Sequence, residues 1–359
     1  MVKTNTPVQI GSHTVKNRIT FAPTVKFDFT DESGMANEKL IAHYAERAKG
    51  GCGLICVEAT AVTPGGRFGK NHMGLWCDEQ IAGHKEITAG CHAYGAVVII
   101  QLNHTGYTSN PECGPAIGSS AVTRQGFRGE YTTVEMSLGD VHAMQQSFVD
   151  AAVRAKKAGY DGVQLHGCHG YLINQFMAPS ANFRTDAYGG PAENRARFCS
   201  EIIAKIRELC GPEFLISVRT SGCDSTLEDA IAVAEEYVKA GCEYLQISSG
   251  MSSLAAVAPF FDPKVTDIQS LGAYFKAHFN GRVPVSCVGG LTEPEQIHYL
   301  IEQEYVDTVD VAKAILADPG FANAVIEGTP YTRCYGCRVC QYGPFTAHQC
   351  PAEAKRLRG

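Results

Sequence analysis

A unit that recurs along this chain limits its fold more than any other feature: a helical pattern ends at a glycine, and a short apolar run follows. Arg47–Gly51, Lys157–Gly159 and Lys239–Gly241 each close such a pattern. A glycine at a helix end fits the left-handed backbone conformation, which glycine adopts at low cost. Strands that alternate with helices pair in parallel, because the chain crosses back over the sheet between them.

Eight apolar runs can be found, mostly without the polar alternation of a half-exposed strand. They are Arg18–Ala22, Gly53–Glu58, Val97–Leu102, Gly162–His166, Phe214–Thr220, Tyr244–Ser248, Val283–Val288 and Thr308–Ala312. Between them, apolar residues recur at helical spacing, as from Met144 to Ala155 and from Phe198 to Leu209. Eight strand–helix units predict a TIM (β/α)8 barrel, of the α/β class.

Three further segments modify this barrel. Val8–Ile10 and Thr14–Val15, split by a Gly-Ser pair, predict a hairpin that closes the barrel floor. The segment 105–139 is long, rich in Gly and Pro and irregular, which favours a structureless binding loop or lid. No linker divides the chain, so we expect one barrel domain over residues 1–330 and a Cys-rich C-terminal extension of it over 331–359.

The composition excludes several classes of protein. Hydrophobic residues make up 45% and charged residues 19% of the chain, as in ordinary globular proteins. The formal net charge of -6 offers no basic surface for nucleic acid. Met1–Ile10 lacks an apolar core, and no run approaches the ~18 apolar residues of a membrane helix. We therefore expect no signal peptide, no membrane contact and a cytoplasmic location.

The chain has 15 cysteines, and they fall into two groups. Most are scattered beside small residues, as Cys52, Cys56, Cys168 and Cys242 are, and these we interpret as small core residues. The other group is Cys334, Cys337, Cys340 and Cys350, separated by two, two and nine residues. Four thiolates at this spacing can hold one [4Fe-4S] cluster. A structural zinc ion and free thiols are the alternatives.

One strand ends in side chains that carry chemistry. His166 and His169 are followed by Tyr171, where the run Gly162–His166 turns toward a helix. In barrels of this kind the catalytic residues lie at the carboxyl ends of strands. Two histidines and a tyrosine there would supply hydrogen-bond donors and an acid. The alternative is a pair of loop histidines near a helix cap.

Several segments in shared order then resemble the old yellow enzyme family of FMN-dependent ene-reductases, over nearly the whole chain. The segments are Asn17–Pro23, Val57–Ala59, Gln101–Gly106, His166–Tyr171, Asn182–Gly190, Glu193–Phe198 and Val288–Gly290. Within this family, the chain most resembles the FMN barrel of 2,4-dienoyl-CoA reductase and 2-enoate reductase. The resemblance implies FMN as the cofactor and NAD(P)H as the reductant. It also implies that the motif at Tyr188, with Arg195 and Arg197, is structural.

The resemblance assigns residues to the flavin. Ala22, Pro23, Thr24 and Ala59 would line the ring, together with His166. Gln101 would bind its pyrimidine edge, and the alternative is a solvated glutamine at the start of a loop. Arg219 would stabilise the anionic reduced ring, and the alternative is a pair with a carboxylate at the barrel top.

The flavin phosphate and the substrate have their own implied residues. The backbone of Gly289 and Gly290 would approach the phosphate, with Ala312 and Lys313 where the family usually has Gly-Arg. His166 and His169 would bind the substrate's carbonyl or carboxylate oxygen, Tyr171 would donate the proton, and Phe27 would contact the substrate.

The implied reaction is reduction of the C=C bond of an α,β-unsaturated carbonyl, acid or thioester. The alternatives are amine dehydrogenase-type oxidation of a C–N bond, or an FMN and Fe-S electron-transfer subunit of a larger complex. No Gly-x-Gly-x-x-Gly unit for a dinucleotide appears, so NAD(P)H would dock on the FMN, or an electron-donor partner would reduce it. The particular alkene, the choice between NADH and NADPH and a homo-oligomeric state stay open.

Overall fold

Eight parallel strands close into a barrel in the computed structural model, which describes residues 2–27, 29–126, 129–251, 260–338, 340 and 350–358. The strands are β3 (Ile19–Phe21), β4 (Leu54–Ala61), β5 (Val97–Asn103), β10 (Gly162–Gly167), β11 (Leu215–Ser221), β12 (Tyr244–Ser248), β13 (Val285–Cys287) and β14 (Thr308–Val311). They follow one another around the barrel in chain order, with β14 paired to β3. Each predicted run overlaps one of these strands, so the predicted TIM barrel is confirmed.

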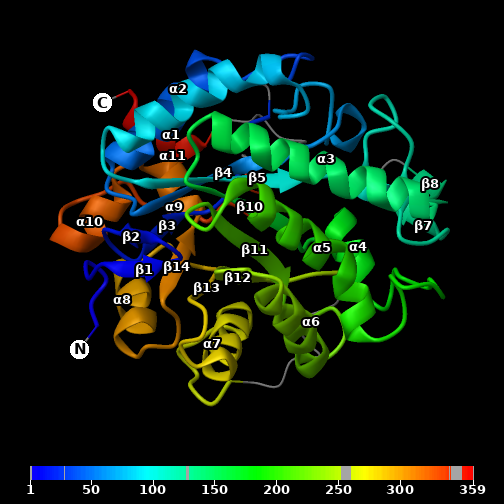
Figure 1. The fold of residues 1–359 in the computed structure, drawn as a ribbon. Coiled ribbons are helices and arrows are strands. Elements are labelled where there is room, and N and C mark those ends of the chain that lie inside the picture. Colours follow the sequence, from blue (N-terminus) through cyan, green and yellow to red (C-terminus); the bar gives the residue numbers. More distant parts are fainter. Residues whose placement is uncertain are drawn as a thin grey trace.

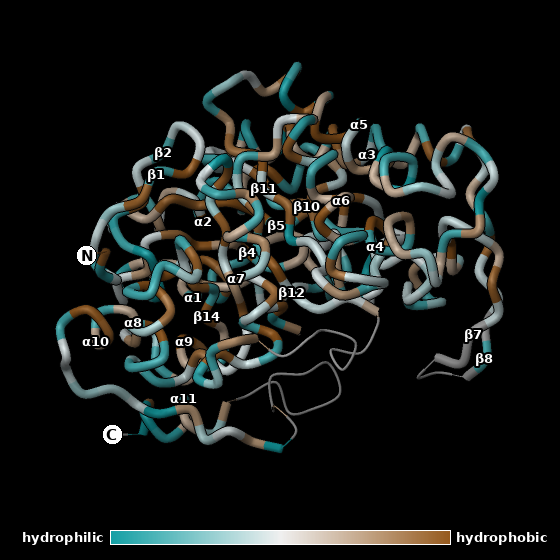
Figure 2. Tube along the Cα trace, turned by 90° about the horizontal axis from the view of Figure 1, so that it is seen from below, coloured by the Kyte–Doolittle hydropathy of each residue, from teal (hydrophilic) through white to brown (hydrophobic). Residues whose placement is uncertain are grey.

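Helices surround the barrel, and the apolar residues lie between the two layers (Figures 1 and 2). The longer helices are α1 (Glu38–Lys49), α2 (Ile81–His92), α3 (Leu138–Lys157), α5 (Ala192–Cys210), α6 (Leu227–Lys239), α7 (Asp267–Phe279) and α8 (Pro294–Glu302). The short ones are α4 (Leu172–Met177), α9 (Lys313–Ala317), α10 (Phe321–Glu327) and α11 (Pro351–Arg356). Gly51, Gly159 and Gly241 have φ of 100°, 86° and 111°, which confirms the left-handed turns after three helices.

The hairpin of β1 (Val8–Ile10) and β2 (His13–Val15) covers one end of the barrel. Ile10 is fully buried against Leu54, Leu215 and Tyr244, the first residues of β4, β11 and β12. Those are the amino ends of the strands, so the hairpin closes the floor as predicted. The opposite end, where the strands finish, is left for a site.

The insertion between β5 and α3 is more ordered than the sequence predicts. It holds a 3₁₀ turn over Gly106–Thr108 and two small sheets, one of β6 (Ile117–Gly118) with β9 (Val134–Glu135), the other of β7 (Thr123–Gly126) with β8 (Gly129–Thr132). The β7–β8 hairpin projects from the molecule (Figures 1 and 2). The expectation of a structureless loop was wrong, because short paired strands satisfy the hydrogen-bonding groups of its backbone.

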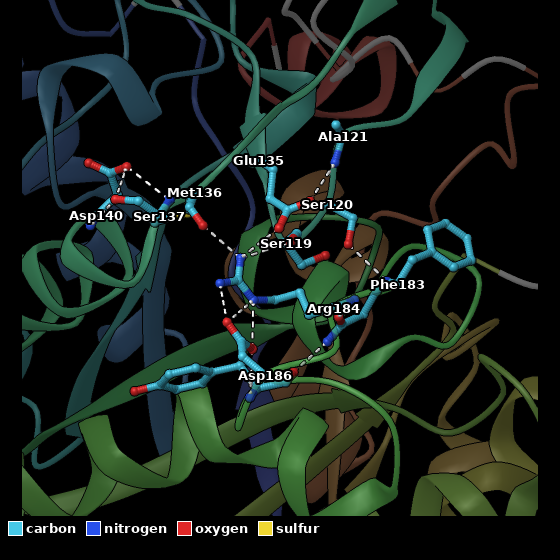
Figure 3. A network of polar contacts seen from close by, with 12 residues as sticks. Ser119, Ser120, Ala121, Glu135, Met136, Ser137, Asp140, Phe183, Arg184 and Asp186 are labelled. Atoms are coloured by element: carbon cyan, nitrogen blue, oxygen red, sulfur yellow. Dashed lines mark hydrogen bonds and ion pairs between the residues drawn. The ribbon is translucent and has the colours of Figure 1, made fainter.

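Arg184 fixes this insertion to the barrel (Figure 3). Its guanidinium is buried, donates to the carbonyls of Ser119 and Met136 at 3.0 and 2.7 Å, and forms an ion pair with Asp186. The backbone N–H of the neighbouring Phe183 donates to the Ser120 hydroxyl at 2.8 Å. The segment Asn182–Gly190 thus has contacts that hold the insertion in place.

Part of the C-terminal extension is described, and it packs on the outer helices. Helix α11 contacts α9, and Glu353 forms an ion pair of 3.6 Å with Arg47 of α1, which is fully buried. Residues 339 and 341–349 lie outside the described part of the chain. Among the helices that are described, none has the length and apolarity needed to cross a membrane.

Candidate active site

The strand register brings polar side chains to the carboxyl end of the barrel. His166 on β10 lies beside Arg219 on β11, and Arg219 lies beside Gln246 on β12. One layer deeper, Gln101 of β5 is paired with Gln164 of β10, and its amide donates to the Gln164 carbonyl oxygen at 2.6 Å. Gln101 is buried, so the alternative of a solvated side chain does not hold.

The two histidines face one another. His166 Nε2 and His169 Nδ1 lie 3.1 Å apart, and His169 Nε2 lies 2.9 Å from the Ser248 hydroxyl. Desolvation and the nearby Arg219 charge lower the pKa of both rings below 6.5, so the rings are neutral at pH 7 and one nitrogen of the facing pair donates to the other. His169 reaches this position with a φ of 62°, which few non-glycine residues adopt.

Tyr171 is the N-cap residue of α4 and packs against the same pair. Its ring centroid is 4.8 Å from that of His166 and 6.3 Å from that of His169. Burial raises the pKa of Tyr171 to about 12, so the phenol keeps its proton at neutral pH. The structure therefore brings His166, His169 and Tyr171 together, as their spacing in the sequence predicts.

An aromatic wall stands beside Tyr171, and of its two phenylalanines the sequence indicated only Phe27. Phe68 packs against Tyr171 at 5.0 Å, and Phe27 lies 6.3 Å from Phe68. His72 accepts from the Phe68 amide at 3.3 Å and therefore donates to the Ala59 carbonyl at 2.6 Å. Phe68 lies outside every apolar run, so only its place in the fold identifies it.

Arg219 is buried at 8% exposure and forms no direct ion pair with a described residue, although its charge acts on the buried Asp310. One of its terminal nitrogens lies 3.5 Å from the Ser248 hydroxyl, and its Nε has no hydrogen-bond partner among the described residues. The predicted alternative, an ion pair with a barrel-top carboxylate, is not found there. A desolvated guanidinium of this kind suits an anionic ligand.

A polar layer that the sequence analysis missed supports these side chains. The Gln246 amide and the Ser286 hydroxyl each donate to the Asp310 carboxyl at 2.8 Å. Burial raises the pKa of Asp310 to about 7, against the effect of Arg219. The signal was present as single polar residues within apolar runs, but their pairing depends on the register of different strands.

The Gly-Gly turn after β13 has the backbone that was expected of a phosphate site. Gly289 and Gly290 have φ of 101° and 66°, and a Cβ on Gly289 would meet Ile268 at 2.1 Å. The buried Gln269 side chain donates to the Gly289 carbonyl at 2.7 Å and holds the turn. No pattern in the sequence indicated this role for Gln269.

The residues after β3 and β4 form a small, mostly apolar surface. Ala22 and Ala59 are buried, and Pro23 and Thr24 are partly exposed. The Thr24 hydroxyl donates to the Ala22 carbonyl at 3.1 Å, which leaves its oxygen free to accept a hydrogen bond.

The four terminal cysteines line one cavity. Cys334, Cys337, Cys340 and Cys350 share it with Lys313, Leu316 and the first residues of α11. Lys313 is exposed at the start of α9, after β14. The sequence placed Lys313 only at the flavin phosphate, and the structure places it at the wall of the cysteine cavity.

Comparison with known proteins agrees with this geometry. A family model described as the NADH:flavin oxidoreductase / NADH oxidase family matches residues 4–331. The chain belongs to this family. It is the old yellow enzyme family that the sequence motifs indicated.

The curated relatives of this family member are oxidoreductases. The chain is 35% identical to an NADPH dehydrogenase of Bacillus pumilus over 327 residues, which cover 89% of this chain and 93% of the relative. It is 33% identical to an NADH oxidase of Thermoanaerobacter brockii, over 92% of this chain and 52% of that longer protein.

Among solved structures, a complex of 2-naphthoyl-CoA reductase with 2-naphthoyl-CoA matches with a TM-score of 0.87 and 27% identity, over 95% of this chain and 55% of the other. The chain thus spans about half the length of two of the proteins it matches. Membership of this family establishes that the chain is an FMN-dependent NAD(P)H oxidoreductase.

The site fits the FMN that the family implies. Three buried polar atoms, Arg219 Nε, His166 Nδ1 and Gln164 Nε2, lack hydrogen-bond partners within the described residues. They lie on the neighbouring strands β10 and β11, and at the turn after β13, two strands from β11, the left-handed Gly289 leaves no space for a side chain. Unpaired buried donors and an open backbone turn match a planar polar ring that carries a phosphate.

Proposed function

We propose that this protein uses NAD(P)H to reduce the C=C bond of α,β-unsaturated carbonyl compounds, acids or thioesters. The observation that carries the proposal is the neutral His166–His169 pair beside a protonated Tyr171. Neutral donors suit an uncharged carbonyl oxygen as well as a carboxylate. The complex of a structural relative with 2-naphthoyl-CoA supports the inclusion of thioesters.

The residues divide the reaction between them. When the substrate oxygen enters, N–H groups of His166 and His169 donate to it and stabilise the negative charge that develops there. Ser248 holds the His169 ring in place through the contact of 2.9 Å. Tyr171 donates its phenolic proton to the α-carbon, and Phe27 and Phe68 shield the site from water.

The same geometry supports an assignment of residues to FMN. Ala22, Pro23, Thr24 and Ala59 would lie along the ring, Gln101 and His166 at its polar edge, and Arg219 beside its anionic end. Gly289, Gly290, Ala312 and Lys313 would hold the phosphate. Bound FMN, once reduced by NAD(P)H, supplies the hydride that adds to the β-carbon.

We also propose that Cys334, Cys337, Cys340 and Cys350 bind a [4Fe-4S] cluster. Their common cavity supports one metal centre with four thiolate ligands, and zinc is the alternative that the same ligands allow. This cavity favours a second function, in which the chain passes electrons to or from a partner. Iron and sulfide analysis of protein purified without oxygen tests it, and Cys337→Ser should abolish both signals.

One experiment tests the main proposal. The purified protein is expected to show flavin absorbance that bleaches with NADPH or NADH under anaerobic conditions and returns when 2-cyclohexenone is added. Bleaching of the oxidised flavin by a simple amine, or return of absorbance only with an external electron acceptor, would replace alkene reduction with one of the alternatives. Protein that binds no FMN after reconstitution would refute the proposal.

A further inference from the structure

Cys168 lies between the two histidines, and the proposed reaction gives it no role. One ligand atom each from His166, Cys168 and His169 lies within 4.8 Å of the other two. The residue is fully buried, and its thiol forms a hydrogen bond with Ser248, which also contacts His169. The sequence alone marked Cys168 as a small core residue, because chain spacing does not show where its sulfur points.

The spacing of these atoms is near that of a metal site but must adjust to reach it. In tetrahedral zinc sites, Zn–N bonds near 2.0 Å and Zn–S bonds near 2.3 Å separate the ligand atoms by about 3.3–3.6 Å. The facing nitrogens of His166 and His169 are 3.1 Å apart. A small opening of this contact places both nitrogens at ligand distance from one ion.

The hydrogen bond to Ser248 is compatible with the tautomer of His169 that a metal requires. A proton on His169 Nε2 is donated to Ser248, which leaves a lone pair on Nδ1 toward His166. Metal-bound histidines are commonly oriented by such a bond at the second nitrogen. Without metal, His166 Nε2 then carries the proton that it donates to His169 Nδ1. When an ion binds, this proton moves to His166 Nδ1, for which the described residues offer no acceptor, and Nε2 binds the ion.

We propose that His166, Cys168 and His169 form an inhibitory site for a thiophilic divalent cation, Zn²⁺, within the substrate pocket. The Cys168 thiol releases its proton to solvent as the S–Zn bond forms, and no electron is transferred. Water takes the fourth position. The ion holds the lone pairs of both histidines, so neither ring orients toward a substrate oxygen.

The nearby charges determine the affinity of the site for zinc. A zinc ion bound to one thiolate carries a net charge of +1, and the Arg219 guanidinium lies close by, 3.5 Å from the shared Ser248 hydroxyl. Repulsion from Arg219 weakens the site, which suits reversible inhibition rather than a permanent structural metal. The inhibitory consequence rests on the proposed function, whereas zinc binding does not.

The test compares Cys168→Ala with Cys223→Ala in the holoenzyme. Cys223 is also buried, near Cys168, but does not belong to the ligand cluster. Equilibrium dialysis with Zn²⁺ should give one bound ion fewer for Cys168→Ala than for the wild type, and no change for Cys223→Ala. The terminal cysteines are present in all three proteins and cancel in the comparison.

Kinetics supply the second readout. Zn²⁺ should raise the apparent KM for 2-cyclohexenone without changing kcat, and Cys168→Ala should need on the order of 100-fold more Zn²⁺ for the same effect. If Cys168→Ala does not fold, Cys168→Ser replaces it, since a hydroxyl is a poor zinc ligand. Equal zinc stoichiometry in variant and wild type would overturn the proposal. Absence of alkene turnover in every protein would refute the proposed function, while dialysis would still decide the metal site.

Discussion

In the proposed reaction Tyr171 donates the proton, and the structure shows the surroundings of its phenol. Tyr171 packs between Phe68 and His166, and burial raises its pKa to about 12. Tyr171→Phe keeps the ring and removes the acid. We expect the rate of alkene reduction to fall by roughly 10²–10⁴-fold, while NADPH still bleaches the flavin at the wild-type rate.

Stopped-flow absorbance measures the two half-reactions of Tyr171→Phe separately. Tyr188→Phe is the matched control, because Tyr188 is a buried tyrosine that donates to Glu201 away from the site. An equal loss in both half-reactions would show that Tyr171 holds the flavin site together and is not the proton donor.

Burial also fixes how the site responds to pH. The pKa of His166 is well below 6.5 and that of Tyr171 is about 12, so neither group changes charge in between. We expect kcat/KM for an uncharged enone to show no step from these residues between about pH 6.5 and 10. A step near pH 6.5 that disappears in His169→Asn would show that the pair is charged in the working enzyme.

At the residue scale, the sequence predicted side chains whose position follows from a single strand. His166, His169 and Tyr171 follow β10, and any residue at that end of a barrel strand reaches the mouth. Ser248 and Phe68 were missed because their contacts with this trio join segments far apart in the chain. Such contacts depend on register and loop path, which no local pattern contains.

The turn between β13 and α8 tests the proposed phosphate site at the scale of an element. Gly289→Ala adds a Cβ that meets Ile268 at 2.1 Å, at a φ of 101°. We expect weaker FMN binding and a loss of roughly 1–3 kcal/mol in the free energy of unfolding. Fluorescence titration of the apoprotein with FMN measures the affinity.

Gly211→Ala is the control for backbone strain alone. Gly211 has a φ of 80°, and a Cβ there would meet no atom within 4 Å. The Gly211→Ala variant should be less stable than the wild type but bind FMN with the same affinity. If both variants lowered FMN affinity alike, the effect of Gly289→Ala would reflect general destabilisation and not the phosphate turn.

The inserted segment depends on one arginine. Arg184→Gln removes the ion pair with Asp186 and the donors to Ser119 and Met136 that are drawn in Figure 3. Loss of a buried charge and its partners costs about 3–5 kcal/mol, so we expect faster trypsin cleavage within residues 105–137. Arg197→Gln, which breaks a partly exposed contact with the Ala187 carbonyl, should leave the cleavage rate near that of the wild type.

At this scale the strands and helices were predictable because each carries its own periodicity. The β6–β9 and β7–β8 pairings were not, because two- and four-residue strands are too short to show alternation. Their position comes from Arg184, whose partners belong to two separate segments. A cleavage rate unchanged in Arg184→Gln would mean that the short sheets hold the insertion without it.

For the whole molecule, the order of strands was predictable from the chain because parallel strands joined by helices follow one another around a barrel. What the sequence could not show is that the barrel interior is polar at its upper end. Asp310, Gln246 and Ser286 come from three different strands and meet only when the barrel closes. This layer makes the stability of the whole barrel depend on pH.

Asp310 sets the direction of that dependence. Its pKa is raised from 3.8 in the unfolded chain to about 7 in the barrel, so the folded state binds a proton that the unfolded state has lost between these values. The stabilisation is complete below pH 3.8 and is lost as the pH rises to about 7. Asp310→Asn removes this titration, and the rotating Ser286 hydroxyl can accept from the new amide.

We therefore expect Asp310→Asn to gain stability relative to the wild type as the pH rises from about 4 to 7, by a few kcal/mol. Urea unfolding of both apoproteins at several pH values measures the difference, and the surface charges they share cancel. Glu235→Gln is a control of opposite sign, since Arg282 lowers the pKa of Glu235 to about 2. That variant should lose stability relative to the wild type as the pH rises from about 2 to 4.5, and the difference should stay level from there to pH 7. A difference for Asp310→Asn that stays level across this range would mean that Asp310 is already ionised in the folded barrel at acid pH, held in that state by Arg219.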